Sequence, residues 1–127
     1  METIRVRIGR LNVTNISNTN EEIKSNGTYL QGHVTVSYNR LRKIFGMHGN
    51  GDEYKQDAEW VIKFDDPFFE DKHNKELIAT IYNWKDGYNY NQHEPEYAMA
   101  INNITDWHIG GHSKEAVLKV KEALAWD

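Results

Sequence analysis

The stretch Ile104-Thr105-Asp106-Trp107-His108-Ile109-Gly110-Gly111-His112-Ser113 organises the expected fold. The apolar residues around Trp107 predict a strand, and the paired glycines predict its end. Ser113 is a favourable N-cap for a helix over residues 114–125, whose apolar positions recur at helical spacing. A strand that ends at glycines and leads into a helix exposes backbone N–H groups, which is the arrangement of an anion site. The same pattern is typical of a plain capped turn, and both interpretations stay open.

Two further strands are predicted upstream of this stretch, over residues 58–64 and 77–84. Both segments are dense in aromatic and β-branched side chains. The connection at 65–76 is charged and too long for a tight hairpin, so we expect a projecting tip. Phe68 and Phe69 in this tip are expected to pack beneath the loop, because exposed apolar pairs are unusual without a function.

The N-terminal third of the chain predicts two more strands and a first helix. Residues 3–13 alternate apolar and charged side chains, and a change of phase at Gly9 indicates a bulge. After a polar loop, a second strand is expected near residues 28–36. Ser37 and Gly46 enclose an amphipathic segment as the N-cap and the stop signal of a helix.

This order of elements predicts an α+β fold. Consecutive strands with short links favour an antiparallel sheet of about four to five strands, with two α-helices packed on one face. The chain has 127 residues, which is the length of one domain. We therefore expect a single domain over 1–127, with an N-terminal β arm at 1–33 and a core at 34–127.

The composition excludes several classes of function. The chain has no cysteine, which excludes disulfides, thiolate metal sites and cysteine nucleophiles. A net charge of −4 gives no basic surface, so nucleic acid is not an expected partner. No apolar run is long enough to span a bilayer, and the N-terminus lacks the apolar core of a signal peptide. We expect neither membrane association nor secretion.

Catalytic and metal-binding patterns are weak in this sequence. No hydrolase, phosphate-loop or dinucleotide motif is present, so we expect no enzymatic activity and no cofactor. His108 and His112 have the spacing of two zinc ligands on a helix, but Gly110 and Gly111 intervene. A metal shared by these histidines and Asp106 is a minor alternative, because hydrogen-bonded structural histidines are commoner. No metal site is predicted.

Aromatic and amide side chains cluster before the paired glycines and favour a binding surface. Rings stack on a nucleobase, amides bind its edge, and backbone N–H groups, histidine and lysine hold phosphate. The amides are Asn83, Asn89, Asn91 and Gln92. Packing of the tryptophans in a core is the competing interpretation, and tyrosine and tryptophan are also favoured at protein-binding surfaces. The predicted ligand-binding residues are Arg40, Tyr82, Trp84, Lys85, Tyr88, Trp107, His108, Gly110, Gly111, His112 and Ser113.

Four segments of the chain also support a resemblance to a known group of proteins. They are Gly51-Asp52-Glu53-Tyr54-Lys55, Asp57-Ala58-Glu59-Trp60, Ala79-Thr80-Ile81-Tyr82-Asn83-Trp84-Lys85-Asp86-Gly87 and Thr105-Asp106-Trp107-His108-Ile109-Gly110-Gly111. Together they resemble a family of small proteins encoded in tailed-phage and prophage genomes. The resemblance covers about residues 34–124, and residues 1–33 and 66–75 look like additions to the family pattern.

The resemblance implies a non-enzymatic inhibitor of bacterial antiviral defence in the cytoplasm of the infected host. One candidate is a sponge, a homodimer or higher homo-oligomer that sequesters a cyclic nucleotide signal of Thoeris- or CBASS-type defence. The alternative is an anti-CRISPR-type protein that binds a nuclease effector through loop 86–97 and the tip at 65–76. No arginine follows Arg42. Phosphate in a sponge would therefore depend on backbone, lysine and histidine, or on arginine from another subunit.

Overall fold

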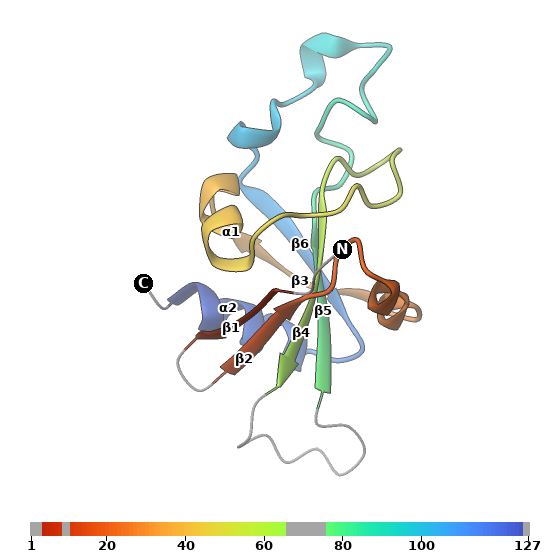
Figure 1. The fold of residues 1–127 in the computed structure, drawn as a ribbon. Helices are drawn as coiled ribbons and strands as arrows, with labels where there is room; N and C mark the ends of the chain where they lie inside the picture. Colours follow the sequence, from red (N-terminus) through yellow and green to blue (C-terminus); the bar gives the residue numbers. More distant parts are fainter. Residues whose placement is uncertain (1–3, 9–10, 66–75, 126–127) are drawn as a thin grey trace.

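The computed structural model describes residues 4–8, 11–65 and 76–125 and has one antiparallel sheet in the strand order β1-β2-β4-β5-β6-β3 (Figure 1). The strands are β1 (Ile4–Ile8), β2 (Leu11–Asn15), β3 (Tyr29–Thr35), β4 (Glu59–Asp65), β5 (Glu76–Tyr82) and β6 (Asp106–Gly111). The helices are α1 (Tyr38–Phe45) and α2 (Glu115–Ala125), with 3-10 turns η1 (Asn20–Ser25), η2 (Pro95–Tyr97) and η3 (Ile101–Asn103). The predicted α+β class is confirmed.

The sheet has six strands instead of the four to five expected. Residues 3–13 were expected to form one bulged strand, but β1 and β2 are two antiparallel strands in which Ile8 pairs with Leu11. The chain therefore reverses between Ile8 and Leu11. The prediction of one bulged strand over residues 3–13 is therefore wrong.

The N-terminal segment expected as an arm at 1–33 belongs to the main sheet. Its β2 pairs with β4, and β3 pairs with β6 at the opposite edge. Both edge strands, β1 and β3, therefore come from the first 35 residues. The predicted tip at 65–76, with Phe68 and Phe69, lies outside the described residues except for its ends, Asp65 and Glu76.

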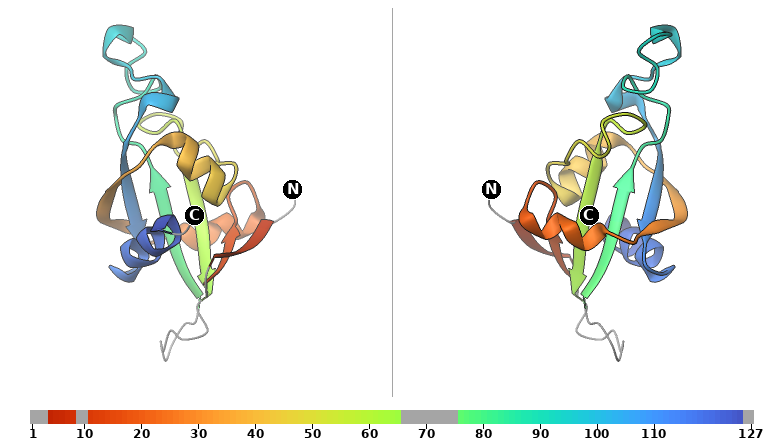
Figure 2. Two further views of the ribbon diagram at one scale, coloured as in Figure 1. Left: turned by 90° about the vertical axis from the view of Figure 1, so that its left-hand side faces the viewer. Right: turned by 90° about the vertical axis from the view of Figure 1, so that its right-hand side faces the viewer.

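One face of the sheet packs against α1 and α2, which we call the helix side (Figure 2). Ser37 caps α1 by accepting a hydrogen bond from the backbone N–H of Arg40 at 3.1 Å, as predicted. Gly46 follows α1 with a φ of 88°, which favours glycine. Side chains from both helices and from the sheet form one apolar cluster that includes Leu41, Trp60, Trp107 and Val120.

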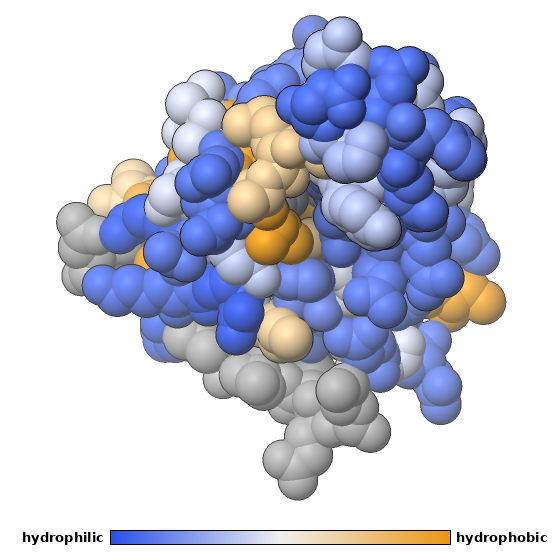
Figure 3. Space-filling view, turned by 90° about the horizontal axis from the view of Figure 1, so that it is seen from above, coloured by the Kyte–Doolittle hydropathy of each residue, from blue (hydrophilic) through white to orange (hydrophobic). Residues whose placement is uncertain are grey.

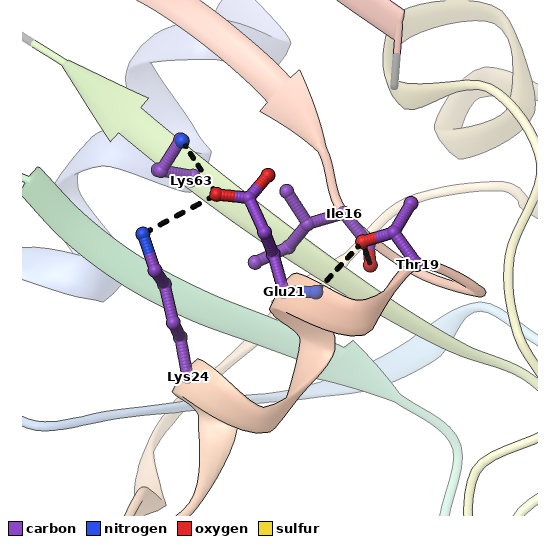
Figure 4. Close-up of polar contacts among 5 residues, drawn as sticks. All are labelled: Ile16, Thr19, Glu21, Lys24 and Lys63. Atoms are coloured by element: carbon purple, nitrogen blue, oxygen red, sulfur yellow. Dashed lines mark hydrogen bonds and ion pairs between the residues drawn. The ribbon is translucent and has the colours of Figure 1, made fainter. Parts of the chain in front are cut away.

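The other face of the sheet, which we call the open side, is only partly covered. The turn η1 lies across this face (Figure 2), above a small apolar cluster of Ile16, Val61 and Ile78. Figure 4 shows how its start is held: Thr19 caps it, and Glu21 lies 3.3 Å from Lys63 of β4 and 3.4 Å from Lys24. These two lysines lower the pKa of the Glu21 carboxyl.

No helix in the described ranges combines the length and the apolar character needed to cross a bilayer.

Candidate functional site

The paired glycines lie inside β6 and not after its end. Gly110 and Gly111 each pair with a residue of β3 on one side and of β5 on the other. A Cβ on Gly110 would collide with Oγ1 of Thr80, and one on Gly111 would lie 2.5 Å from Cβ of Ala116. The predicted turn with free N–H groups is therefore wrong, and the two glycines allow close packing on both faces of a central strand.

The segment after β6 differs from the predicted capped turn. Helix α2 begins at Glu115, two residues beyond the predicted N-cap, and Ser113 accepts the backbone N–H of Ala116 through its carbonyl. Because Glu115 lies in the first turn, a carboxylate already interacts with the positive end of the helix dipole. His112 is exposed, with Nε2 3.4 Å from the carbonyl oxygen of Lys24.

Two other predicted ligand residues, Trp107 and Arg40, lie on the helix side of the sheet. Trp107 is fully buried, and its Nε1 donates a hydrogen bond to the carbonyl of Ile104 at 3.2 Å. Arg40 in α1 donates through Nη2 to the carbonyl of Leu124 at 2.6 Å. The core interpretation of Trp107 is confirmed, and the sheet separates both residues from the open side.

The structure brings Tyr82, Trp84 and His108 together on the open side and adds His33 to them. Ring centroids are 6.0 Å apart for Trp84 and Tyr82, 5.5 Å for Tyr82 and His108, and 4.4 Å for His108 and His33. We call these four side chains the ring row. It extends across β5, β6 and β3, so a flat ligand or a partner side chain can contact several rings.

The electrostatics of this face favour uncharged rings. Burial lowers the pKa of the His108 imidazole, and the neighbouring His33 lowers it further. Burial also raises the pKa of the Tyr82 hydroxyl. Beside Tyr82 and Trp84 lies an open cavity of about 160 Å³, which Glu59 also lines. Burial raises the pKa of Glu59 to about 7, and Glu22 and Asp52 raise it as well.

The sequence suggested Asp106, His108 and His112 as a minor alternative set of metal ligands, and His112 is the wrong member of that set. Among the described residues, Asp106 and His108 form a group of potential ligands with His33 and not with His112. Four residues of extended chain span about 13 Å, so His112 lies too far from His108 to share a metal ion with it. His33 comes close because β3 pairs with β6 in a register that places His33 opposite His108.

A second feature is the end of the molecule formed by loops 46–58 and 83–105, at the top of Figure 1, which we call the loop end. Its centre is the fully buried side chain of Asn83. The Oδ1 of Asn83 accepts the backbone N–H groups of Asp57 and Ala58 at 2.7 and 3.2 Å. Its Nδ2 donates to the carboxylates of Asp57 and Asp86 at 2.8 and 2.9 Å. One amide therefore joins the two loops.

The other amides that were expected to bind a nucleobase also take part in internal hydrogen bonds. Asn89 donates to the carbonyl of Gln56 at 2.9 Å, and Asn91 donates to the carbonyls of Lys85 and Gly87. Gln92 donates to the carbonyl of Asn89 at 3.2 Å. These hydrogen bonds tie each of the three amides to the loop backbone and fix its position.

The surface of the loop end is rich in exposed aromatic rings, which we call the tyrosine surface. The exposed fractions are 58% for Tyr54, 61% for Tyr88, 38% for Tyr90 and 66% for Tyr97. The Nζ atoms of Lys55 and Lys85 lie over neighbouring rings, 5.2 Å from the centroid of Trp84 and 5.5 Å from that of Tyr90. Seen from above, this end is mainly hydrophilic, with a few apolar side chains near the middle (Figure 3).

Comparison of the chain with protein-family models, curated proteins and solved structures gives no match.

Sequence reasoning missed His33 and Glu59 and assigned Asn83 to the surface. His33 alternates with apolar residues in the strand at 28–36, which was a usable signal that it faces away from the core. Glu59 begins a strongly apolar strand, which was a signal that burial would raise the pKa of its carboxyl. For Asn83 the local signal was insufficient, because only Asp86 is near in sequence and the other groups that it binds lie 25 and 26 residues earlier.

Proposed function

We propose that this chain is a non-enzymatic binding protein that a phage uses to inhibit a bacterial nuclease effector by direct contact through the tyrosine surface. The observation that carries the proposal is a set of exposed tyrosines on loops that an internal hydrogen-bond network joins. Tyrosine provides large contact area with few rotatable bonds, and for this reason it is enriched at protein-binding surfaces.

Rigidity of the loops matters because it reduces the entropy cost of binding. Besides the Asn83 bonds, the Asp57 carboxylate accepts the backbone N–H of Asn89 at 2.9 Å. The Asp52 carboxylate accepts three consecutive backbone N–H groups in the facing loop, those of residues 54–56. A Cβ on Gly87 would collide with the Asp57 carboxylate and would displace it from its hydrogen bonds to Asn83 and Asn89. The loops are thus shaped before any partner arrives.

The charge of the loop end indicates the chemistry of the partner. Segments 49–57 and 83–97 carry six carboxylates against two lysines, which equals the net charge of −4 of the whole chain. A tyrosine-rich, acidic surface is complementary to a basic protein surface, and the nucleic-acid-binding groove of a nuclease is such a surface. The same excess of carboxylates repels a phosphorylated ligand.

Sequestration of a cyclic nucleotide is the second candidate and keeps one supporting observation. The Nζ of Lys55 lies 5.2 Å from the centroid of the Trp84 ring, beside the open cavity of about 160 Å³. A stacked base and a nearby cation are two of the features that a nucleotide requires. Arg40 contacts the carbonyl of Leu124, and the paired glycines lie inside the sheet, so the phosphate half of that site lacks support.

Biolayer interferometry with purified CRISPR effector complexes, with and without bound target DNA, tests the proposal. We expect binding to the DNA-free effector, inhibition of its cleavage, and affinity that falls with added salt. Tyr88→Ala and Tyr90→Ala should each weaken binding by about tenfold or more. Leu118→Ala is the matched control, because Leu118 is 58% exposed on α2, away from the loop end.

The outcome also separates the two candidates. Binding that both tyrosine variants leave unchanged, or absence of binding to every effector, contradicts the protein-binding proposal. A rise in melting temperature with a cyclic nucleotide that Trp84→Ala abolishes would support sequestration in its place.

A further inference from the structure

Two histidines and one aspartate converge on the open side of the sheet, where β3 pairs with β6. Asp106 and His108 are two residues apart on β6, so their side chains lie on the same face. His33 is the direct partner of His108 on β3. The potential ligand atoms of the three residues all lie within 4.8 Å of one another, and Nδ1 of His33 is 3.4 Å from Oδ1 of Asp106. In the described part of the chain, this is the one such group of three.

We propose that His33, Asp106 and His108 bind a divalent transition-metal ion, with Zn²⁺ as the best match. Two imidazole nitrogens and one carboxylate oxygen suit Zn²⁺, whereas Mg²⁺ and Ca²⁺ prefer oxygen ligands alone. The site uses residues other than those of the tyrosine surface, so it goes beyond the proposed protein binding.

The spacing of the ligand atoms fits metal binding with small side-chain movements. Zn²⁺ bonds to nitrogen and oxygen are about 2.0–2.2 Å long, so ligand atoms around a tetrahedral ion lie roughly 3.3 Å apart. The His33–Asp106 pair is already at this distance. The side chains of His33 and Asp106 are 50% and 68% exposed, so both are free to rotate toward the ion. The paired strands fix the three backbone positions and reduce the entropy cost of binding.

The surroundings leave one side of the metal position open. The Tyr82 ring lies 5.5 Å from the His108 ring and covers one flank of the group. Because His33 and Asp106 are exposed, the opposite flank faces solvent. Three protein ligands with an open fourth position are the arrangement in which a metal retains a water or accepts a donor from another molecule.

Isothermal titration of the purified full chain with ZnCl₂ at neutral pH tests this assignment. We expect one ion per chain, and we expect His33→Gln, Asp106→Asn and His108→Gln each to weaken binding by about tenfold or more. The matched controls are His112→Gln and His93→Gln, which remove exposed histidines outside the group. Zinc should also shift the imidazole ¹⁵N resonances of His33 and His108 and leave that of His112 in place.

Two results would overturn the assignment. One is the absence of zinc binding at about 100 µM, which is far above the working range of protein zinc sites. The other is binding that the His33→Gln variant retains in full or that the His112→Gln variant loses equally, which would assign the ion to scattered surface histidines. A melting curve of each variant shows that a loss of binding does not come from unfolding, and His33→Gln is the safest variant because His33 is half exposed.

Discussion

On the helix side of the sheet, Trp60 and Trp107 are fully buried, whereas on the open side Tyr82 and Trp84 lie beside a cavity and solvent. The two pairs come from the same kind of aromatic-rich strand sequence. The difference arises because alternate residues of a strand face opposite sides of the sheet, and α1 and α2 cover only one of these sides. Identical residue types therefore stabilise the fold on one face and are available for binding on the other.

The largest effect that tests this contrast is expected for Trp107→Ala. Removal of this fully buried ring should lower the free energy of unfolding by about 3–5 kcal/mol. Trp84→Ala should lower it by less than about 1 kcal/mol, because Trp84 is 38% exposed. Urea denaturation of both variants measures the two values. Equal losses would show that the open-side ring is as structural as the buried one.

The next effect concerns the buried amide that joins the two loops. Asn83→Ala removes the acceptor of the Asp57 and Ala58 N–H groups and the donor to two carboxylates, so we expect a loss of about 2–3 kcal/mol. Hydrogen exchange in loops 46–58 and 83–105 should rise with it. Asn91→Ala is the control, since its two bonds lie within one loop and it should cost about 1 kcal/mol. If the loops exchange as slowly in Asn83→Ala as in the parent protein, the network is not what holds them.

Much of the fold could be predicted because its signals are local. The apolar residues around Trp107 predicted a strand, and Ser37 and Gly46 predicted the bounds of α1. The strand count failed at residues 3–13, where one bulged strand was expected and the structure has two paired strands. The prediction of a turn at the paired glycines failed because a glycine pair has two common roles. Glycine forms a turn at the end of a strand, but inside a central strand it allows close packing.

The arrangement of the candidate sites could not be predicted, because it depends on contacts between distant parts of the chain. His33 and Asp106 are 73 residues apart in sequence and meet only through the pairing of β3 with β6. No local pattern specifies that register. Arg40 and His108 were expected to converge on one ligand. They lie on opposite sides of the sheet, because α1 packs on the face that His108 does not share. The sequence indicated which residue types were available for binding and not which of them share a face.

A smaller effect tests whether the paired glycines serve packing. Gly110→Ala should lower the free energy of unfolding by about 2 kcal/mol, because the new Cβ collides with Oγ1 of Thr80 on the open side. Adding Thr80→Ala removes the colliding oxygen and should restore at least half of that loss in a double-mutant cycle. Thr80→Ala alone serves as the control. Independent, additive losses would mean that the glycine is required for a reason other than this contact.

The smallest expected effect concerns Glu59, a partly buried carboxyl on the open side. Its pKa is raised from 4.5 to about 7 by burial first and by Glu22 and Asp52 second. The folded chain therefore holds this proton more tightly than the unfolded chain, and stability attributable to Glu59 falls as pH rises from about 4.5 to 7.

Glu59→Gln removes this dependence, so the free energy of unfolding of the variant should exceed that of the parent protein by about 1 kcal/mol at pH 8 and by little at pH 5. Denaturation curves at both pH values measure the difference, and a gain that is equal at the two values would mean that Glu59 does not titrate in this range. A positive result would show that the open side tolerates a costly, partly buried carboxyl next to its cavity.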